Sequence, residues 1–584
     1  MMKKYISMIA ASMMLVSCLD TIILPDDKTV DEDFWQNKAE VSSMVNAAYS
    51  AMASNDVVAD IFVWGDFRSD EMTLGTSAAS TAVYDALNEI ATLNIQTTNR
   101  YAAWSSLYSV INRCNIVLAR AGAVRDIDPN YTQGDYDAHR SQMLALRALC
   151  YFYLVRAYRD VPYITDAYMT SSQNTQVAQS TPAYVLERCI ADLEEAAKYP
   201  ILASGFTTNE WQRVGWLTND GINALLADIY LWRAAVTHSA ADYQRCIDYC
   251  DLVITSKQSQ HDNRFDVETK NYPLASAGAA YTSLFVNQNA EESIFELQLR
   301  GNLTVEQFLY KYANNSSGEG FLKATPMFNS AASKVVNVSA TQVFSTNDLR
   351  YYASCYGVGG GDGNLDIRKM IGNSSVTELK SQPRDAIDYA SGGLDRNHII
   401  YRLSDVMLMK AEALVELVDT NQTAAELQAQ LRVPFTLVQE VNTRSLYSEN
   451  LADSMTWDTP CNYKNYSKEQ MEELVMKERM RELCFEGKRW FDLLRYNYRH
   501  TDYSADQYNT LLVDLHETNR LGTIYTGMKT LIVNASGSDG TAVAAKMQNE
   551  AYLYMPVPNS DIIVCKLLKQ NPVYKSGNAF EKSY

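Results

Sequence analysis

The stretch that decides the fold of this chain reads Glu478-Arg-Met-Arg-Glu-Leu-Cys-Phe-Glu-Gly-Lys-Arg-Trp-Phe-Asp-Leu-Leu-Arg-Tyr496. Apolar or small residues recur in it every three to four positions, which is the period of one face of a helix. This stripe consists of Met480, Leu483, Cys484, Gly487, Phe491 and Leu494. We therefore predict a helix across the whole stretch.

Charged residues fill the positions between these apolar ones, at spacings that allow ion pairs on a helix. The predicted pairs are Glu478–Arg481, Arg479–Glu482, Glu486–Arg489, Lys488–Asp492 and Asp492–Arg495. Because Gly487 inside a helix costs roughly 1 kcal/mol relative to Ala, we expect a neighbouring segment to pack closely there. From the residues alone, a charge-rich packing helix is as good an interpretation as a functional one.

The N-terminus has the parts of a secretory signal. Positive residues at 3–4 precede an apolar run over 5–16, and the tetrad Leu15-Val16-Ser17-Cys18 fits a bacterial lipobox, in which the cysteine thiol is lipidated. The run is shorter than the ~20 apolar residues that span a bilayer. We predict a signal peptide over 1–17 and a lipid anchor on Cys18. The alternative is an ordinary signal peptide followed by an incidental cysteine.

Composition indicates a large globular protein that does not bind nucleic acid. The chain has 584 residues, of which 47% are hydrophobic, and its net charge is -18. Loss of the two signal-peptide lysines would bring the net charge to about -20. Nucleic acids and anionic lipid surfaces attract basic proteins, so this acidity argues against both as electrostatic partners.

Helical periodicity dominates both ends of the chain, whereas the middle lacks it. The predicted helices cover about 38–53, 101–121, 136–158, 182–198, 218–235 and 241–256, and helical texture returns after 401 and over 467–496. Small residues alternate with aromatic ones on these helices, which loosely matches tetratricopeptide-type hairpins. From about 257 to 395 we expect long loops with short helices or strands, and long irregular segments are often functional. The segment from Tyr552 to Ile562 is expected to be extended.

Cysteine and histidine patterns favour no metal site, disulfide framework or cofactor. Cys246 and Cys250 are the only close pair, and no second close pair completes a zinc site. Cys114, Cys150, Cys189 and Cys484 sit in apolar helical patterns, where a buried thiol acts as a small hydrophobic group. The stretch Gly357–Asp366 alternates acidic and amide residues like a calcium loop, but Ile367 stands where the turn glycine belongs, so a turn is the better interpretation.

Common catalytic motifs are missing, so we expect a protein that is not an enzyme. The sequence contains no Gly-x-Ser-x-Gly elbow, no His-Glu-x-x-His motif and no P-loop. A glycosidase needs a pair of carboxylates, and among 69 acidic residues nothing marks such a pair.

The opening stretch closely resembles the C-terminal signature of the SusD/RagB-like family of outer-membrane nutrient-binding lipoproteins. Further segments resemble this family in matching order. They are Cys18 with the 20–25 tether and Phe34-Trp35, then Trp104–Asn115, Ala145–Pro162, Asp348–Arg350, Arg402–Glu412 and Met555–Pro572. The resemblance implies a mainly α fold of tetratricopeptide-like hairpins with a large irregular, loop-rich C-terminal part. We accordingly divide the chain into an N-terminal helical-repeat region over 18–270 and a C-terminal region over 271–584.

The resemblance also implies partners and a cellular location. It implies a protein that is anchored by lipid to the outer membrane, faces outside, and serves as a lid over a SusC-like TonB-dependent transporter. The usual cargo is an oligosaccharide, and some relatives carry peptides instead. A surface hydrolase or a structural adhesin is a more distant alternative.

Ligand-binding candidates follow from the chemistry of sugars. Pyranose rings stack their C–H faces on aromatic side chains, and their hydroxyls need polar partners. Since the resemblance implies contacts from early loops and from the irregular middle region, we select aromatic and polar residues in those segments. The selected residues are Trp64, Arg68, Tyr84, Tyr310, Tyr312 and Asn314. For each, an ordinary core or loop role is the alternative.

Overall fold

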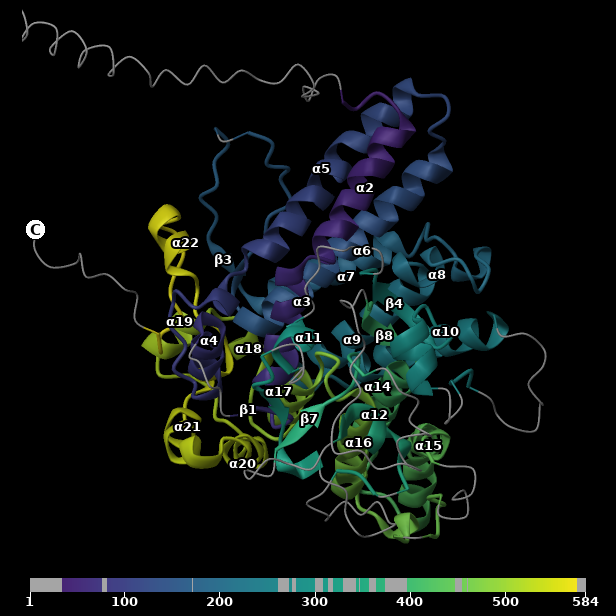
Figure 1. Ribbon diagram of the computed structural model, residues 1–584, viewed down its shortest axis with the longest axis vertical. Coiled ribbons are helices and arrows are strands. Elements are labelled where there is room, and N and C mark those ends of the chain that lie inside the picture. Colours follow the sequence, from purple (N-terminus) through teal and green to yellow (C-terminus); the bar gives the residue numbers. More distant parts are fainter. Residues whose placement is uncertain are drawn as a thin grey trace, which may run out of the picture.

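Antiparallel helix pairs build the first half of the molecule. The computed structural model describes residues 34–75, 81–170, 172–260, 272–275, 280–299, 308–313, 319–328, 343–345, 347–356, 364–372, 396–446, 454–459 and 461–574. The long helices of this half are α2 (Lys38–Met52), α5 (Ser105–Ile127), α6 (Gln133–Tyr158), α7 (Pro182–Ala196), α9 (Asn219–Thr237) and α10 (Ala240–Gln260). Contacts link α2 to α5, α5 to α6, α6 to α7, and α9 to α10, as hairpins require. Figure 1 shows α2, α5 and α6 side by side at one end of the molecule.

These helices confirm the predicted ones to within a few residues, because their start signals are local. Asn37 begins α2 with a capping box that includes Glu40, and Thr132 begins α6 in the same way with Asp135. The second half of α6, from Ser141 to Tyr158, is buried on every side. A helix that is buried all round forms the centre of a helical assembly rather than its surface.

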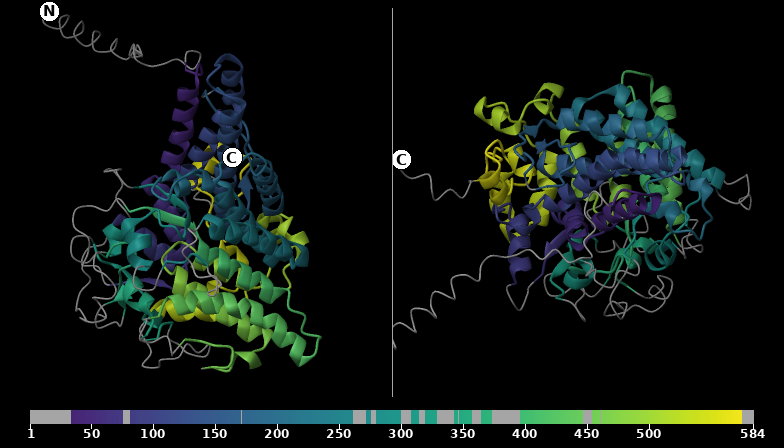
Figure 2. Two further views of the ribbon diagram at one scale, coloured as in Figure 1. Left: turned by 90° about the vertical axis from the view of Figure 1, so that its right-hand side faces the viewer. Right: turned by 90° about the horizontal axis from the view of Figure 1, so that it is seen from above.

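A second group of helices packs on the first. It contains α14 (Leu403–Glu416), α15 (Ala424–Arg444), α16 (Lys468–Leu483) and α17 (Arg489–Arg499), and α14 joins the two groups through α10. Figure 2 shows these green helices stacked below the blue helices of the first half. Cys114, Cys150, Cys189 and Cys484 are all buried with free thiols, which agrees with the small hydrophobic role predicted for them.

The predicted single helix over 478–496 is wrong, because the chain breaks between α16 and α17. Phe485 and Gly487 have positive φ angles of 62° and 79°, which a continuous helix does not allow. The Asp66 carboxylate accepts hydrogen bonds from the Gly487 and Lys488 amides at 2.6 and 3.0 Å, and so caps the start of α17. The break is therefore imposed by a residue far away in the sequence.

Two segments cross at this break, and we call residues 63–71 with 484–489 the signature crossing. A Cβ atom added to Gly65 would lie 2.1 Å from the Gly487 carbonyl oxygen, and one added to Gly487 would lie 2.8 Å from Ile61 Cγ2. The close neighbour predicted at Gly487 is thus confirmed. Two glycines are needed because the backbones themselves are in contact.

Small sheets link the middle segments to the helices. β1 (Met72–Leu74), β5 (Leu322–Ala324), β7 (Leu365–Ile367) and β6 (Cys355–Tyr356) form an antiparallel sheet in that order. β4 (Ser293–Leu297) pairs with β8 (His398–Arg402), and β2 (Val161–Pro162) pairs with β3 (Gln179–Ser180). Asp366 of the calcium-like stretch lies in β7 and forms an ion pair with Lys323, while residues 357–363 lie outside the described residues.

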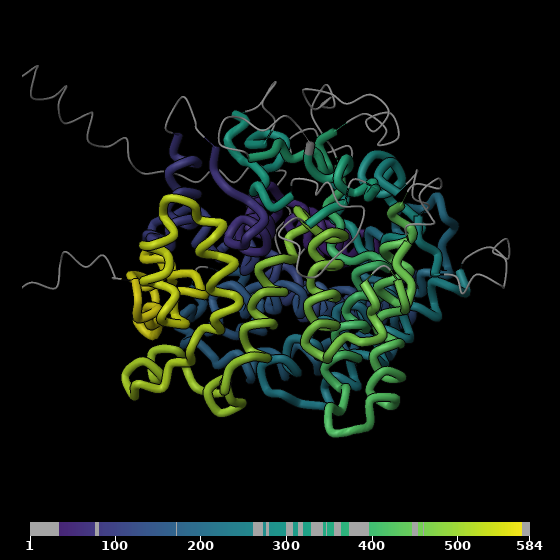
Figure 3. Tube along the Cα trace, turned by 90° about the horizontal axis from the view of Figure 1, so that it is seen from below, coloured from purple at the N-terminus to yellow at the C-terminus, as the bar shows by residue number. Residues whose placement is uncertain are grey.

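Short helices complete the described chain. They are α3 (Asn55–Phe62), η1 (Val63–Phe67), α4 (Ala82–Ala91), η2 (Arg100–Ala102), η3 (Ala203–Gly205), α8 (Gln212–Gly215), η4 (Thr282–Asn287), α11 (Phe308–Ala313), η5 (Pro326–Phe328), α12 (Leu349–Ser354), η7 (Tyr463–Asn465), α18 (Ala505–Tyr508), α19 (Leu512–Glu517), α20 (Thr526–Ala535), η8 (Gly537–Asp539), α21 (Gly540–Lys546), η9 (Glu550–Leu553) and α22 (Asn559–Val564). Figure 3 shows the yellow C-terminal segments gathered on one side of the green helices. The segment predicted to be extended, residues 552–562, begins in η9 and ends in α22, so that prediction holds only for its middle part, residues 554–558.

The predicted fold class is confirmed: the protein is mainly α, with helical hairpins and a loop-rich later part. None of the described helices is both long and apolar enough to cross a membrane. Cys18 and the predicted signal peptide precede the described residues, and the division of the chain near residue 270 stays a prediction.

Candidate functional site

Aromatic side chains from three separate segments meet beside the small sheet, and we call them the aromatic cluster. Its members are Tyr84, Phe308, Tyr312 and Phe321, whose rings contact one another, and Tyr310, which lies on the same helix as Phe308 and Tyr312 and packs against the core. Phe321 is the link, since its ring centre lies 5.4 Å from that of Tyr84 and 5.3 Å from that of Tyr312. The Tyr84 and Tyr310 side chains are half-buried, whereas the others are buried. The cluster therefore has a sealed interior and two tyrosines at its edge.

Local sequence explains how the cluster is positioned. The Thr81 hydroxyl accepts a hydrogen bond from the Tyr84 amide at 3.2 Å and so caps the start of α4, the helix that carries Tyr84. The Gly75 amide donates to the Phe321 carbonyl at 2.7 Å, and this bond extends the β1–β5 pairing up to Phe321. Tyr310 and Tyr312 lie on the short helix α11. Three predicted binding residues, Tyr84, Tyr310 and Tyr312, are thus brought to one region.

Trp64 lies behind the cluster and not on its surface. Its side chain has 0% exposure, and its indole N–H donates to the Tyr101 carbonyl at 2.8 Å. Tyr101 packs edge-on against Phe308, with ring centres 6.0 Å apart. Since no face of Trp64 is open to a sugar ring, the structure gives it a supporting role in place of the predicted direct contact.

Arg68 is also buried, at 4% exposure. Its guanidinium lies 4.5 Å from the centre of the Trp490 ring, and its Nη2 donates to the Tyr552 carbonyl at 3.0 Å. Burial lowers the pKa of Arg68 to about 10. The burial of Arg68 therefore argues against the predicted contact with a ligand. Arg68 instead packs an early segment of the chain against late ones. Asn314, the remaining candidate, lies outside the described residues.

A charged network, which the sequence did not reveal, fills the space beside the signature crossing. It contains Glu292, Asp348, Arg350, Lys369, Arg402, Arg444, Glu478, Glu482 and Glu486. Arg402 is its centre and pairs with Glu292 at 3.0 Å, with Glu486 at 2.8 Å and with Glu482. Of the pairs predicted within the opening stretch, Glu478–Arg481 and Asp492–Arg495 are confirmed at 2.8 and 2.7 Å.

The other predicted pairs are replaced by pairs with distant segments. Arg479 binds Asp405 and Asp492, both from 2.9 to 3.0 Å, and not Glu482. Arg489 binds Asp70 at 2.8 Å, and Lys488 binds Asp405 at 3.1 Å. Helical spacing fails for Glu486–Arg489 because the chain breaks at Gly487, so these two residues no longer share one helix face. Arg479 and Glu482 do share α16, but each pairs with charged residues of other segments instead.

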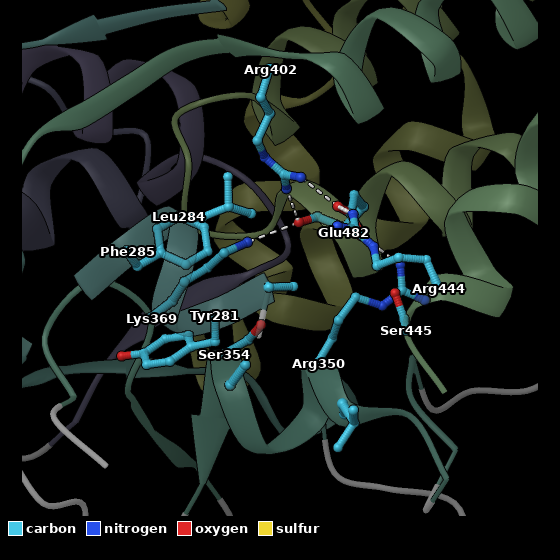
Figure 4. A pocket seen from close by; sticks show the side chains of 13 residues that line it. Tyr281, Leu284, Phe285, Arg350, Ser354, Lys369, Arg402, Arg444, Ser445 and Glu482 are labelled. Atoms are coloured by element: carbon cyan, nitrogen blue, oxygen red, sulfur yellow. Dashed lines mark hydrogen bonds and ion pairs between the residues drawn. The ribbon is translucent and has the colours of Figure 1, made fainter. Parts of the chain in front are cut away.

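A cavity of about 40 Å³ opens between this network and an apolar wall. Figure 4 shows Tyr281, Leu284 and Phe285 on one side and Arg402 and Glu482 on the other. The volume is far below the 300–1,000 Å³ of typical ligand sites and suits about three water molecules. The cavity is thus not large enough for a sugar ring.

Three glutamates of the network, Glu478, Glu482 and Glu486, have lowered pKa values and are held ionised. Burial alone would raise the pKa of Glu482, but Arg444, Arg402 and Arg350 together hold it well below its usual value. The pKa of Glu486 is lowered against burial by Arg402 and Lys369. An acid with a lowered pKa does not donate a proton at neutral pH, so neither group suits general acid catalysis. Among the described residues, no group of three or more His, Cys, Asp or Glu side chains is arranged to hold a metal ion.

Paired helices with a small, partly open aromatic cluster define a helical binding-protein scaffold. The family model described as "SusD family" matches residues 300–574, and the one described as "Starch-binding associating with outer membrane" matches residues 23–209. The chain belongs to the SusD/RagB-like family.

Individual relatives agree with this assignment. SusD-like protein P38 of Formosa agariphila is 26% identical over 502 residues, which cover 83% of this chain and 89% of that protein. A SusD superfamily structure from Bacteroides vulgatus gives a TM-score of 0.64 at 16% identity and covers 92% of this chain and 99% of its own. The structure of NanU from B. fragilis gives a TM-score of 0.60 at 18% identity, and the match covers 94% of this chain and 100% of NanU. The structural likenesses show the shared fold.

Proposed function

We propose that this protein is an outer-membrane lipoprotein that binds oligosaccharides or polysaccharide at the cell surface and delivers them to a SusC-like TonB-dependent transporter. The aromatic cluster carries the binding part of this proposal. Tyr84 and Tyr310 are half-exposed on a rigid aromatic base, and such rings stack against the C–H faces of sugars. Family membership supports the class of cargo, since one matching model is described as starch-binding.

Exposed polar groups complete the chemistry that sugar hydroxyls require. Asn88 is exposed one turn after Tyr84 on α4, and Lys311 lies 5.8 Å from the Tyr312 ring centre. A shallow site with aromatic faces and a few polar side chains fits a sugar chain. The pairing of the charged network instead supports a structural role for the buried acids, in keeping with binding rather than hydrolysis.

Binding is tested with the chain that begins after Cys18 and a panel of soluble starch, xylan, pectin and alginate, by affinity electrophoresis and calorimetry. We expect retention on at least one polysaccharide and a loss of about tenfold or more in affinity with Tyr84→Ala or Tyr310→Ala. Tyr184→Ala is the control, because Tyr184 is 41% exposed on a different helix, α7. Retention that survives both cluster variants would contradict the assigned site. If the protein bound no glycan but did bind members of a peptide library, the cargo would be a peptide and the proposed glycan binding would be wrong.

The anchor and the transporter are tested in cells. Cys18→Ala is expected to abolish palmitate labelling and to release the protein from outer-membrane fractions. Protease added to whole cells should digest the wild type if it faces outside. Purification of the tagged wild type from membranes should bring down a TonB-dependent transporter in roughly equal amount, and its absence would contradict the delivery role.

A further inference from the structure

A second aromatic surface lies on α8, away from the aromatic cluster, and we call Phe206, Trp211, Gly215 and Trp216 the Trp211 platform. Trp211 is 43% exposed, which is unusual for so large an apolar side chain. Trp216 packs against it with ring centres 6.0 Å apart and a 78° angle between planes, and Phe206 packs on Trp216 at 5.9 Å and 79°. Figure 1 shows α8 on the opposite side of the molecule from α4.

The Trp211 ring lies directly on the backbone beneath it. A Cβ atom on Gly215 would lie 2.5 Å from Trp211 Cε3 and 2.9 Å from Cζ3. Any other residue at position 215 would push the ring away, so the glycine lets the ring lie flat against the turn. One side of the ring is therefore covered, and the remaining exposed area is held in a single orientation.

The turn that carries the ring is fixed from below. Arg213 is buried at 4% exposure, and its Nη2 donates to the Asn289 and Ala290 carbonyls, both at 3.0 Å. Val214 and Leu217 are buried on either side of the turn. An exposed ring on an anchored support loses little conformational freedom when it binds a ligand, which is the preorganisation that binding surfaces use.

A run of polar residues leads into Trp211. Thr207, Thr208, Asn209 and Glu210 precede it in sequence and are all exposed. Glu210 accepts hydrogen bonds from the Thr207 amide at 2.8 Å and from its hydroxyl at 3.0 Å, which closes this segment into a turn beside the platform. An exposed apolar ring next in sequence to an exposed polar turn offers the two kinds of contact that a pyranose needs, for its C–H face and for its hydroxyls.

We infer that the Trp211 platform is a second glycan-binding site, which holds a pyranose ring of a polysaccharide against the Trp211 indole. This inference rests on the proposed glycan-binding function. A site on a different face from the aromatic cluster would add to retention of long chains, since two contacts on one polymer raise its effective affinity. Short oligosaccharides, which reach one site at a time, would gain nothing from it.

The test uses affinity electrophoresis of the chain that begins after Cys18 on the same four polysaccharides. Trp211→Ala is expected to weaken retention of the bound polysaccharide about threefold to tenfold, and to leave calorimetric binding of its tetrasaccharide unchanged. Trp211→Tyr keeps an aromatic ring and is expected to restore most of the retention. Tyr184→Ala is the matched exposed control, and circular dichroism checks that each variant is folded.

The outcomes separate this inference from the proposed function. Loss of binding with Tyr84→Ala, together with unchanged retention for Trp211→Ala, would overturn the second site alone. Failure of the wild type to bind any of the four polysaccharides would overturn both. If Trp211→Ala retained polysaccharide normally but no longer co-purified with the transporter, the platform would be a protein-binding surface and the glycan assignment would be wrong.

Discussion

The signature crossing and the Trp211 platform both need a glycine, because a Cβ atom at that position would clash with a close neighbour. The two glycines serve different surroundings, one a buried crossing and the other a surface platform. At the crossing, Gly65 meets the backbone at Gly487, and the nearby ion pair between Asp70 and Arg489 is buried. At the platform, Gly215 supports a ring that stays 43% exposed. The most recognisable stretch of the sequence is therefore scaffold, and the surfaces with ligand chemistry lie where the sequence carries weaker signals.

The largest expected effect is on the charged network. Glu482→Gln removes the carboxylate that pairs with Arg350, Arg402 and Arg444 while these stay buried, so we expect a loss of about 3–5 kcal/mol in unfolding free energy. Chemical denaturation followed by two optical probes measures it. Glu194→Gln is the control: its pair with Arg245 has both side chains 47% exposed, and its loss should cost less than about 1 kcal/mol. Equal losses would remove the contrast between buried and exposed charges.

The next effect is on the contact between the two glycines. Gly65→Ala is expected to lower the free energy of unfolding by about 1–3 kcal/mol. The loss should be at the upper end of this range, because the new methyl group would clash with the Gly487 backbone, which cannot move aside as a side chain can. Gly205→Ala is the matched change, since nothing lies within 4 Å of a Cβ atom there. The same denaturation assay compares them. A harmless Gly65→Ala would mean that the crossing can shift apart.

Acid should weaken the scaffold before it affects the surface. The folded-state pKa values of Glu478, Glu482 and Glu486 are lowered, because arginine and lysine partners outweigh burial. Their stabilisation is therefore complete above the usual glutamate value near 4.3 and is lost as pH falls below it, by up to about 1.4 kcal/mol per pH unit for each proton taken up. Melting temperature measured from pH 7 to pH 3 should fall steeply below about pH 4.5. In Glu482→Gln the fall should be shallower, and parallel curves would exclude this group as a source.

The smallest expected effect on stability is at the Trp211 platform, in contrast to the large effects at the signature crossing and the charged network. Trp211→Ala should lower the unfolding free energy by only about 1 kcal/mol, because 43% of the side chain is exposed and the rest covers only the turn at Gly215 and the Trp216 ring. A loss of several kcal/mol would show that Trp211 is structural packing. The denaturation assay used for the glycine variants gives this value directly.

Much of the helical architecture could be predicted because its signals are local. The first residues of α2 and α6 can be predicted, because the capping residues of each helix lie within three positions of its start. The break at Gly487 could not, since the cap that stabilises it is Asp66, which lies in another part of the chain. For the same reason, the sequence predicts that Trp64 and Arg68 contact ligand from an early loop, whereas the structure buries both, and the neighbouring Asp70 pairs with Arg489.

The candidate site was predictable only in part. Tyr84, Tyr310 and Tyr312 could be selected from aromatic residues in irregular segments, but the meeting of Tyr84 and Tyr312 at Phe321 depends on the pairing of β1 with β5. Trp211 gave no signal, because exposure depends on Gly215 and on the anchoring of Arg213. Tertiary contacts, and not local pattern, decide which aromatic residues face solvent.

The Asp66 cap also governs when the protein can finish folding. Its donors are the amides of residues 487–489, more than four hundred positions further on, so the crossing forms only after nearly the whole chain is available. Until then, Asp66, Asp70 and Glu71 lack the partners that make their burial tolerable. Contacts of such long sequence separation fold slowly. A chain shortened before residue 484 would lack these amides, so the signature crossing could not form around Asp66.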